Sequence, residues 1–137
     1  MYYTSLLLAV AGSVIYHLSM KQTPQNLNPF FTLAISYGAA LLLCLIGLAL
    51  EPAGSTRLTD LNWSVGGLAL GIVGIETGFL LAYRAGWNLG YASLGSNALA
   101  TMVLLPLGYW LFREHLSMAR LSGAALTLGG LWLMMKA

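Results

Sequence analysis

Glu76 is the residue whose type and position most directly suggest chemistry. It stands near the middle of an apolar stretch, Trp63–Trp87, that is long enough to cross a membrane, and none of the three other acidic residues lies so deep. A carboxylate in hydrocarbon costs roughly 2.5–3.5 kcal/mol on insertion scales, so it normally faces a cavity or a polar partner. Two interpretations stay open: Glu76 binds a ligand or a proton, or it is a protonated group hydrogen-bonded to a neighbouring helix.

The other face of the same stretch carries glycines. On a helix advancing roughly 100° per residue they fall within about 60° of one another and form two successive GxxxG steps, which predicts close packing against a neighbouring helix. These glycines are Gly67, Gly71, Gly74 and Gly78. Glu76 projects from the opposite face together with Tyr83, whose ring could stack on a flat or cationic ligand. The carboxylate is therefore not expected in the glycine seam.

Two further stretches offer polar groups at membrane depth. Ser93, Asn97 and Thr101 follow at i, i+4 and i+8, so they share one helix face. They can line a binding site or hydrogen-bond to another helix, and for Asn97, with two donors and two acceptor lone pairs to satisfy, both interpretations stay open. In the first stretch Ser13 and His17 share a face. His17 could carry a proton, because the ordinary pKa of histidine is about 6.5, but it lies one turn from Lys21, where a solvated interfacial histidine is ordinary.

Several classes of protein lack their signature residues here. The sequence contains no GxSxG, HExxH, CxxC, GxxxxGK[ST] or GxGxxG motif, and it has two histidines and one cysteine. We therefore expect no enzyme, no metal site and no cofactor. The net charge of +2 is small and scattered, so nucleic acid is not expected as a partner either.

Composition indicates the element that must position Glu76, a transmembrane helix. The 137 residues are 58% hydrophobic and 7% charged, a balance typical of integral membrane proteins. Each apolar stretch is long enough to cross about 30 Å of hydrocarbon as a helix. We predict an all-α, polytopic membrane protein with one transmembrane domain, residues 1–137. Its five spans are Tyr3–Met20, Pro29–Leu50, Trp63–Trp87, Tyr91–Phe112 and Ser117–Met135.

The connections between these spans predict helix ends and neighbours. Asn28 followed by Pro29 is typical of a helix start, and Asn62 can cap the third span. The turns at 88–90 and 113–116 are short, so the helices that flank each turn should be antiparallel neighbours. Lys and Arg near the span ends divide equally between the two sides of the membrane: Arg57, Arg113 and Arg120 on one, Lys21, Arg84 and Lys136 on the other.

Because Lys and Arg set orientation, an unbiased chain can insert both ways round, and two copies could then pair in opposite orientations. If some of these charges are buried, the orientation is fixed instead. Both interpretations stay open.

From Leu89 onward the sequence resembles the end of an EamA-type repeat of the drug/metabolite transporter superfamily. The matching features are a small-residue helix with Pro106, the turn Phe112–Leu116, and a closing helix with Gly123, Gly129 and Gly130. Five spans equal one half of a ten-helix member, and a lone repeat of this size looks like the five-helix bacterial and archaeal branch. The resemblance implies a multi-pass protein of the cell (inner) membrane in which two copies build the transport path.

A second resemblance fails at one position. Residues 13–21 look like the first helix of the small multidrug resistance proteins, which have an essential membrane glutamate at the position of Ser13. That carboxylate is missing here, so a mechanism in which drug and proton compete for it does not transfer. We hypothesise that Glu76 supplies the ionisable group from a different helix.

The combined expectation is a transporter of small organic solutes that works by alternating access in a homodimer, about a site near the bilayer midplane. Glu76 would bind a proton or a cationic group, and Asn97, Tyr83 and Ser13 would be further wall residues. Two alternatives remain. The chain could be a non-transporting assembly partner of a larger membrane protein, or it could flip a lipid-linked intermediate, with Arg84 and Lys21 near headgroup depth.

Overall fold

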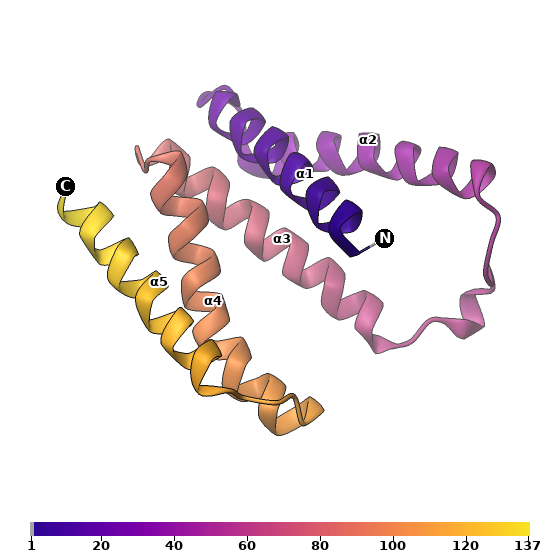
Figure 1. Cartoon of the computed structure of the whole chain (residues 1–137). Helices are drawn as coiled ribbons and strands as arrows, with labels where there is room; N and C mark the ends of the chain where they lie inside the picture. The colour runs from indigo at the N-terminus through magenta and orange to yellow at the C-terminus, as the bar shows by residue number, and fades with distance from the viewer. Residues whose placement is uncertain (1) are drawn as a thin grey trace.

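Five long α-helices account for most of the chain in the computed structural model, which describes residues 2–137 (Figure 1). A single turn of 3₁₀ helix, η1 (Leu58–Asp60), interrupts the longest connection, and the described residues include no strand. Each long helix has the length and composition to cross a membrane. The prediction of an all-α protein with five transmembrane helices is confirmed. The helices are α1 (Tyr2–Gln22), α2 (Pro29–Leu50), α3 (Trp63–Arg84), α4 (Leu89–Phe112) and α5 (Met118–Lys136).

Polar side chains fix where four of these helices begin. The Asn28 side chain accepts hydrogen bonds from the backbone N–H groups of Phe30 (2.9 Å) and Phe31 (3.2 Å), and Pro29 follows it in the first turn. Asn62 accepts from the N–H of the second residue of α3. Asn88 and Ser117 cap α4 and α5 in the same manner. Such caps satisfy N–H groups that have no partner inside the helix, so each start is encoded locally.

The connection between α3 and α4 differs from the prediction. The third helix ends at Arg84, three residues before the predicted Trp87, because Gly86 adopts a φ of +93° that terminates the helical backbone. The fourth helix begins at Leu89, two residues before the predicted Tyr91, since Asn88 serves as its cap. The turn predicted at residues 88–90 therefore lies at 85–88.

Helix α3 is the centre of the arrangement. It packs against α1, α2 and α4, whereas α5 packs against α4 alone. Figure 1 shows α4 and α5 running side by side in opposite directions, as the short connection predicted, and shows residues 51–62 joining α2 and α3 across the open end of the molecule. Helix α3 is consequently bordered by α1 and α2 on one side, and by α4 near its end.

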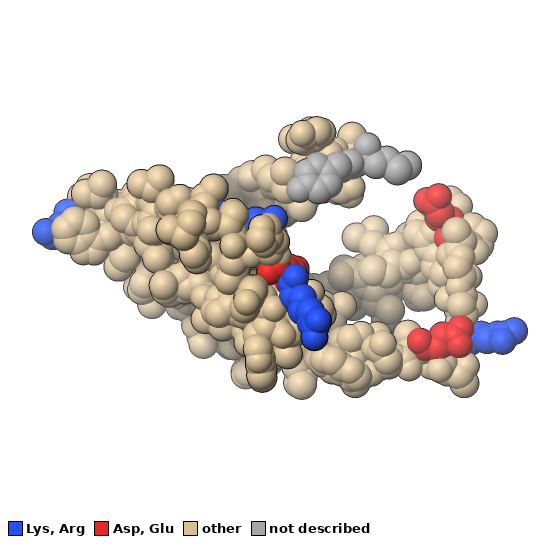
Figure 2. Space-filling view, turned by 60° about the horizontal axis from the view of Figure 1, so that its bottom comes forward, with Lys and Arg blue, Asp and Glu red and all other residues tan. Residues whose placement is uncertain are grey.

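The buried core is small and lies where α1 ends, α2 begins, α3 ends and α4 begins. Its members are Met20, Leu33, Leu80, Tyr83 and Ala92, and Leu80 is only 1% exposed. Most other apolar side chains are exposed, and the face of the molecule seen in Figure 2 is almost entirely uncharged, with Lys, Arg, Asp and Glu confined to a few places on it. Such a surface suits lipid rather than water. The helices are held together at one end and diverge towards the other.

Candidate functional site

Glu76 lines a cavity of about 270 Å³ between α1, α2 and α3. Its side chain is partly buried, and it is the acidic residue of that lining, which contains no Lys, Arg or His. A polar cavity of this size has ample room for water, which needs only about 10–15 Å³ of accessible volume per molecule. The carboxyl group thus borders open space near the middle of the α3 span.

Hydroxyl groups make up much of the rest of this wall. Thr23 directly follows α1, and Thr32 and Ser36 come from α2. Each donates its hydroxyl hydrogen to a backbone carbonyl four residues earlier, at 3.2, 3.2 and 3.0 Å respectively. Because the donor of each hydroxyl is already used, what remains for a ligand is the oxygen lone pairs. These three hydroxyl groups therefore offer acceptors, which suits a ligand that donates hydrogen bonds.

Two phenol groups complete the cavity. Tyr16 of α1 and Tyr37 of α2 both line it, and both hydroxyl oxygens are buried with no hydrogen-bond partner. The Glu76 carboxyl group lines the same space as both phenols. Buried polar groups are nearly always hydrogen-bonded, so an unpartnered pair beside a carboxylate indicates a place for water or a ligand. We call Glu76, Tyr16 and Tyr37 with their hydroxyl-lined wall the Glu76 cavity.

Tyr83 does not line this cavity. Its side chain is 5% exposed, and its hydroxyl lies 2.8 Å from Nδ1 of His17. The rings of Tyr83 and Phe79 are stacked at 5.9 Å, and His17 meets Phe79 edge-on at 4.7 Å. Tyr16 packs edge-on against both His17 and Phe79, at 4.9 and 6.3 Å. These four rings join α1 to α3, so the place of Tyr83 is in the wall behind Tyr16.

Two basic residues fasten the connections at the end of the molecule nearest this cluster. Lys21 Nζ donates to the carbonyl oxygen of Trp87 (3.1 Å), and Arg84 Nη2 donates to that of Pro24 (3.2 Å). Each bond links the α1–α2 connection region to the α3–α4 region. Lys21 and Arg84 therefore hold the closed end together and leave the Glu76 cavity without a positive charge.

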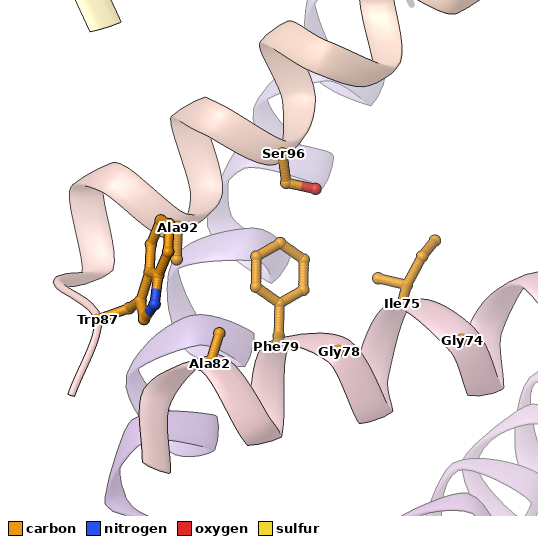
Figure 3. Close-up of a pocket in the computed structure, with 8 residues that line it drawn as sticks. All are labelled: Gly74, Ile75, Gly78, Phe79, Ala82, Trp87, Ala92 and Ser96. Carbon is orange, nitrogen blue, oxygen red and sulfur yellow. The ribbon is translucent and has the colours of Figure 1, made fainter. Parts of the chain in front are cut away.

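The glycine face of α3 does not pack as predicted within one chain. A Cβ atom added at Gly71, Gly74 or Gly78 would meet no other atom within 4 Å. Gly74 and Gly78 instead border a second cavity of about 280 Å³ between α3 and α4, where the Phe79 ring and Ser96 point towards each other (Figure 3). The predicted close helix contact is wrong for a single chain, because α4 crosses α3 near its end rather than along this face.

The remaining predicted site residues lie apart from Glu76. Asn97 lines a groove between α4 and α5, and its side chain is exposed. Ser13 is exposed on α1, one turn before His17. The structure thus brings Glu76 together with none of the other three residues predicted with it in one cavity. Roles for Asn97, Tyr83 and Ser13 in binding stay predictions.

Sequence reasoning missed the residues that do surround Glu76. Thr32, Ser36 and Ala40 follow at i, i+4 and i+8 in α2, the same spacing that drew attention to Asn97 in α4, and Tyr37 stands beside them. This stripe was the available signal, since it places hydroxyl groups on one face of an otherwise apolar helix. Among the described residues, no group of three or more His, Cys, Asp or Glu side chains could hold a metal ion.

Five membrane-length helices around a partly buried carboxylate define a multi-pass membrane protein. The chain belongs to the EamA-like transporter family, whose model matches residues 1–136. Members of this family are transporters of the drug/metabolite superfamily rather than enzymes, so a small-molecule substrate and a lipid bilayer are its partners. No curated protein matches the chain, and no solved structure does.

Proposed function

We propose that this protein transports small organic solutes that carry a positively charged group, and that Glu76 binds this group. The observation that supports the proposal is the composition of the Glu76 cavity, which combines one carboxylate, two unpartnered phenols and several hydroxyl acceptors with no basic side chain. A protonated amine supplies a positive charge for the carboxylate and N–H donors for the acceptor oxygens of this wall. An anionic solute would meet a like charge and would be rejected.

Proton coupling follows from the same chemistry. A carboxyl group that binds a cation when ionised can bind a proton in its place, so solute and proton would alternate on Glu76. Only the forms in which Glu76 holds a proton or a cationic solute would be neutral enough to reorient, since an ionised carboxylate without a partner is costly near the bilayer midplane. The expected mechanism is alternating access, in which helices rock about a site near the middle of the membrane.

A homodimer is the assembly that we propose for this transport path. On the glycine face of α3, a Cβ atom added at Gly71, Gly74 or Gly78 would meet no other atom within 4 Å, and every helix carries exposed large apolar side chains. Six Lys and Arg residues divide equally between the two sides of the membrane, which is compatible with two copies of opposite orientation. We place the assembly in the cell (inner) membrane, with residues 1–137 forming one transmembrane domain in each copy.

A matched series of three compounds tests the charge preference. Phenethylamine, phenethyl alcohol and phenylacetate share a ring and a similar length but carry a positive charge, no charge and a negative charge. We expect only the amine to raise the melting temperature of the purified protein, because only it pairs with Glu76. The shift should disappear in Glu76→Gln and persist in Glu51→Gln, which changes an exposed carboxylate at the end of α2.

Transport itself is measured in proteoliposomes with labelled phenethylamine. We expect an outward-directed proton gradient to drive counter-movement of the amine in the wild type and in Glu51→Gln, and we expect Glu76→Gln to lose that dependence on the gradient. Gradient-driven movement that survives unchanged in Glu76→Gln would contradict the role given to this carboxyl group. A melting shift of equal size for the amine and the alcohol would contradict the charge preference.

A further inference from the structure

The groove between α4 and α5 has the opposite electrostatic character to the Glu76 cavity. It encloses about 340 Å³ and contains one cation, Arg120, and no acidic residue in its lining. Most of its wall is apolar and comes from Leu94, Ala98 and Leu105 of α4 with Ala124 of α5. A ligand that fits such a wall is amphipathic, with a negative group at the Arg120 end and an apolar body along the helices. We call this space the α4–α5 groove.

Arg120 is positioned by the start of α5. Ser117 caps the helix and accepts a hydrogen bond from the backbone N–H of Arg120 (3.2 Å), so this arginine lies within the first turn. One N–H of its guanidinium donates to the carbonyl oxygen of His115 (2.6 Å). No acidic group pairs with it among residues 2–137, and most of its N–H donors remain available. A fixed guanidinium with free donors is well suited to a phosphate.

The groove extends along the membrane normal about as far as one lipid molecule does. Arg120 stands near the end of a span, where headgroups lie, and the groove extends from Leu105 to Leu94 along α4. Eleven residues of helix correspond to about 16 Å, which is roughly half of the hydrocarbon thickness. An acyl chain that follows the groove would therefore run from the headgroup level to about the bilayer midplane.

The hydroxyl groups along the groove do not conflict with an apolar occupant. Thr101 donates to the carbonyl oxygen of Asn97 (2.7 Å), and Thr127 donates to that of Gly123 (2.9 Å). With their hydrogens used in the backbone, both threonines can present methyl groups to a ligand without leaving a donor unpaired. Asn97 is the remaining polar side chain, and it lies about 12 Å along α4 from the Arg120 end.

We propose that the α4–α5 groove binds an anionic membrane phospholipid, with its phosphate on Arg120 and an acyl chain along α4. Basic pockets between transmembrane helices bind such headgroups because the charge lies at the right depth and the helices hold the chain. This site involves helices and charges separate from the Glu76 cavity. The proposal therefore does not depend on the transport function, and either one can fail without the other.

The experiment compares lipids that differ only in headgroup charge. The purified protein in an uncharged detergent receives phosphatidylglycerol or phosphatidylcholine with identical acyl chains, and the melting temperature and the lipid-bound mass by native mass spectrometry are recorded. We expect phosphatidylglycerol to stabilise the protein, since a ligand that binds only the folded state raises its melting temperature. Glycerol phosphate, which has the anion without the acyl chains, should give no shift at the same concentration.

Two substitutions of arginine give a matched control. Arg120→Gln should weaken phosphatidylglycerol binding by roughly tenfold or more, as expected for loss of a charged hydrogen bond. Arg113→Gln removes an equal charge from the neighbouring turn, outside the groove lining, and should retain binding. Ala124→Phe keeps both charges but fills the groove, and it should also reduce binding. If Arg120→Gln fails to fold, Ala124→Phe with Arg113→Gln still tests the site.

Four outcomes would overturn the proposal. Equal shifts with phosphatidylglycerol and phosphatidylcholine would show that the charge is not recognised. Equal losses in Arg113→Gln and Arg120→Gln would indicate diffuse attraction in place of a site. A shift produced by glycerol phosphate alone, or loss of lipid binding in Asn97→Leu, would assign the groove to a polar solute, because an acyl chain has no use for the Asn97 amide.

Discussion

Three tyrosines around the Glu76 cavity differ in one respect that predicts opposite effects of the same substitution. The hydroxyl of Tyr83 is paired with His17 at 2.8 Å, whereas those of Tyr16 and Tyr37 are buried without a partner. Replacement by phenylalanine removes only the hydroxyl and keeps the ring. We expect Tyr83→Phe to destabilise the fold, and Tyr16→Phe and Tyr37→Phe to leave its stability unchanged or raise it.

The expected magnitudes follow from these hydrogen bonds. A side-chain hydrogen bond between membrane helices contributes about 0.6 kcal/mol on average and about 1.7 kcal/mol at most, so Tyr83→Phe should cost an amount in this range. An unpaired buried hydroxyl costs about 1–3 kcal/mol when it is dry and nearly nothing when water reaches it. Because the Glu76 cavity has room for water, the gain for Tyr16→Phe and Tyr37→Phe should be closer to zero than to 3 kcal/mol.

Ligand binding should rank the three variants in the reverse order. If the protonated amine donates to the phenol oxygens, the loss of each acceptor should weaken phenethylamine binding by roughly 2–12-fold, corresponding to about 0.5–1.5 kcal/mol. Tyr83→Phe should bind the amine with little change, since its hydroxyl faces His17. Reversible unfolding in mixed micelles supplies the stabilities, and titration calorimetry supplies the affinities.

Two results would refute this reasoning. If Tyr16→Phe and Tyr37→Phe lowered stability as much as Tyr83→Phe, their hydroxyls would have partners in the membrane, and the open site would not exist. If all three variants bound the amine as tightly as the wild type, the phenols would not face the ligand. The comparison is internal, because the same chemical change is made at three positions within one group of helices.

Two further predictions concern packing. Leu80→Ala, at the most buried side chain, should lower the free energy of unfolding by about 2 kcal/mol or less, the lower end of the roughly 2–5 kcal/mol known for buried leucines. The cost is small because lipid also solvates an exposed leucine, so only the loss of packing remains. Unfolding in mixed micelles measures it. Gly71→Ala should stabilise the monomer by about 0.5–1 kcal/mol, since the added methyl group meets nothing within 4 Å. The same change should weaken self-association if a second copy packs on this face. Sedimentation of the protein–detergent complex measures self-association separately from stability.

The helices could be predicted from the sequence because their determinants are local. Length and hydropathy alone define a membrane helix, and the caps at Asn28 and Asn62 act on N–H groups two or three residues away. The errors occurred where a single backbone angle decided the outcome. Gly86 adopts a φ of +93° two residues beyond Arg84 and ends α3, whereas Gly71 lies within that helix.

The site was less predictable because it depends on which helices become neighbours. Helical spacing correctly placed Glu76 opposite the glycines, with Leu80 and Tyr83 on its side of α3. It could not show that α1 and α2 would cover that side, and so it did not identify Tyr16 and Tyr37. A pairing such as Tyr83 with His17 joins residues 66 positions apart, and no local pattern encodes it.

The arrangement of charge around α3 gives a physical reason for the placement of Glu76. Arg84 is the nearest cation to Glu76 along the chain, and Lys21 lies at the same closed end of the molecule, yet both bind backbone carbonyls there and neither lines the cavity. A permanent ion pair with either cation would neutralise the carboxylate and remove its attraction for a cationic solute. Because the fold occupies these cations elsewhere, the charge of Glu76 can be balanced only by a proton, by water or by what enters the cavity. When a proton or a cationic solute binds such an unpaired carboxylate, the free-energy cost of exposing it to hydrocarbon falls. Binding can therefore drive a conformational change.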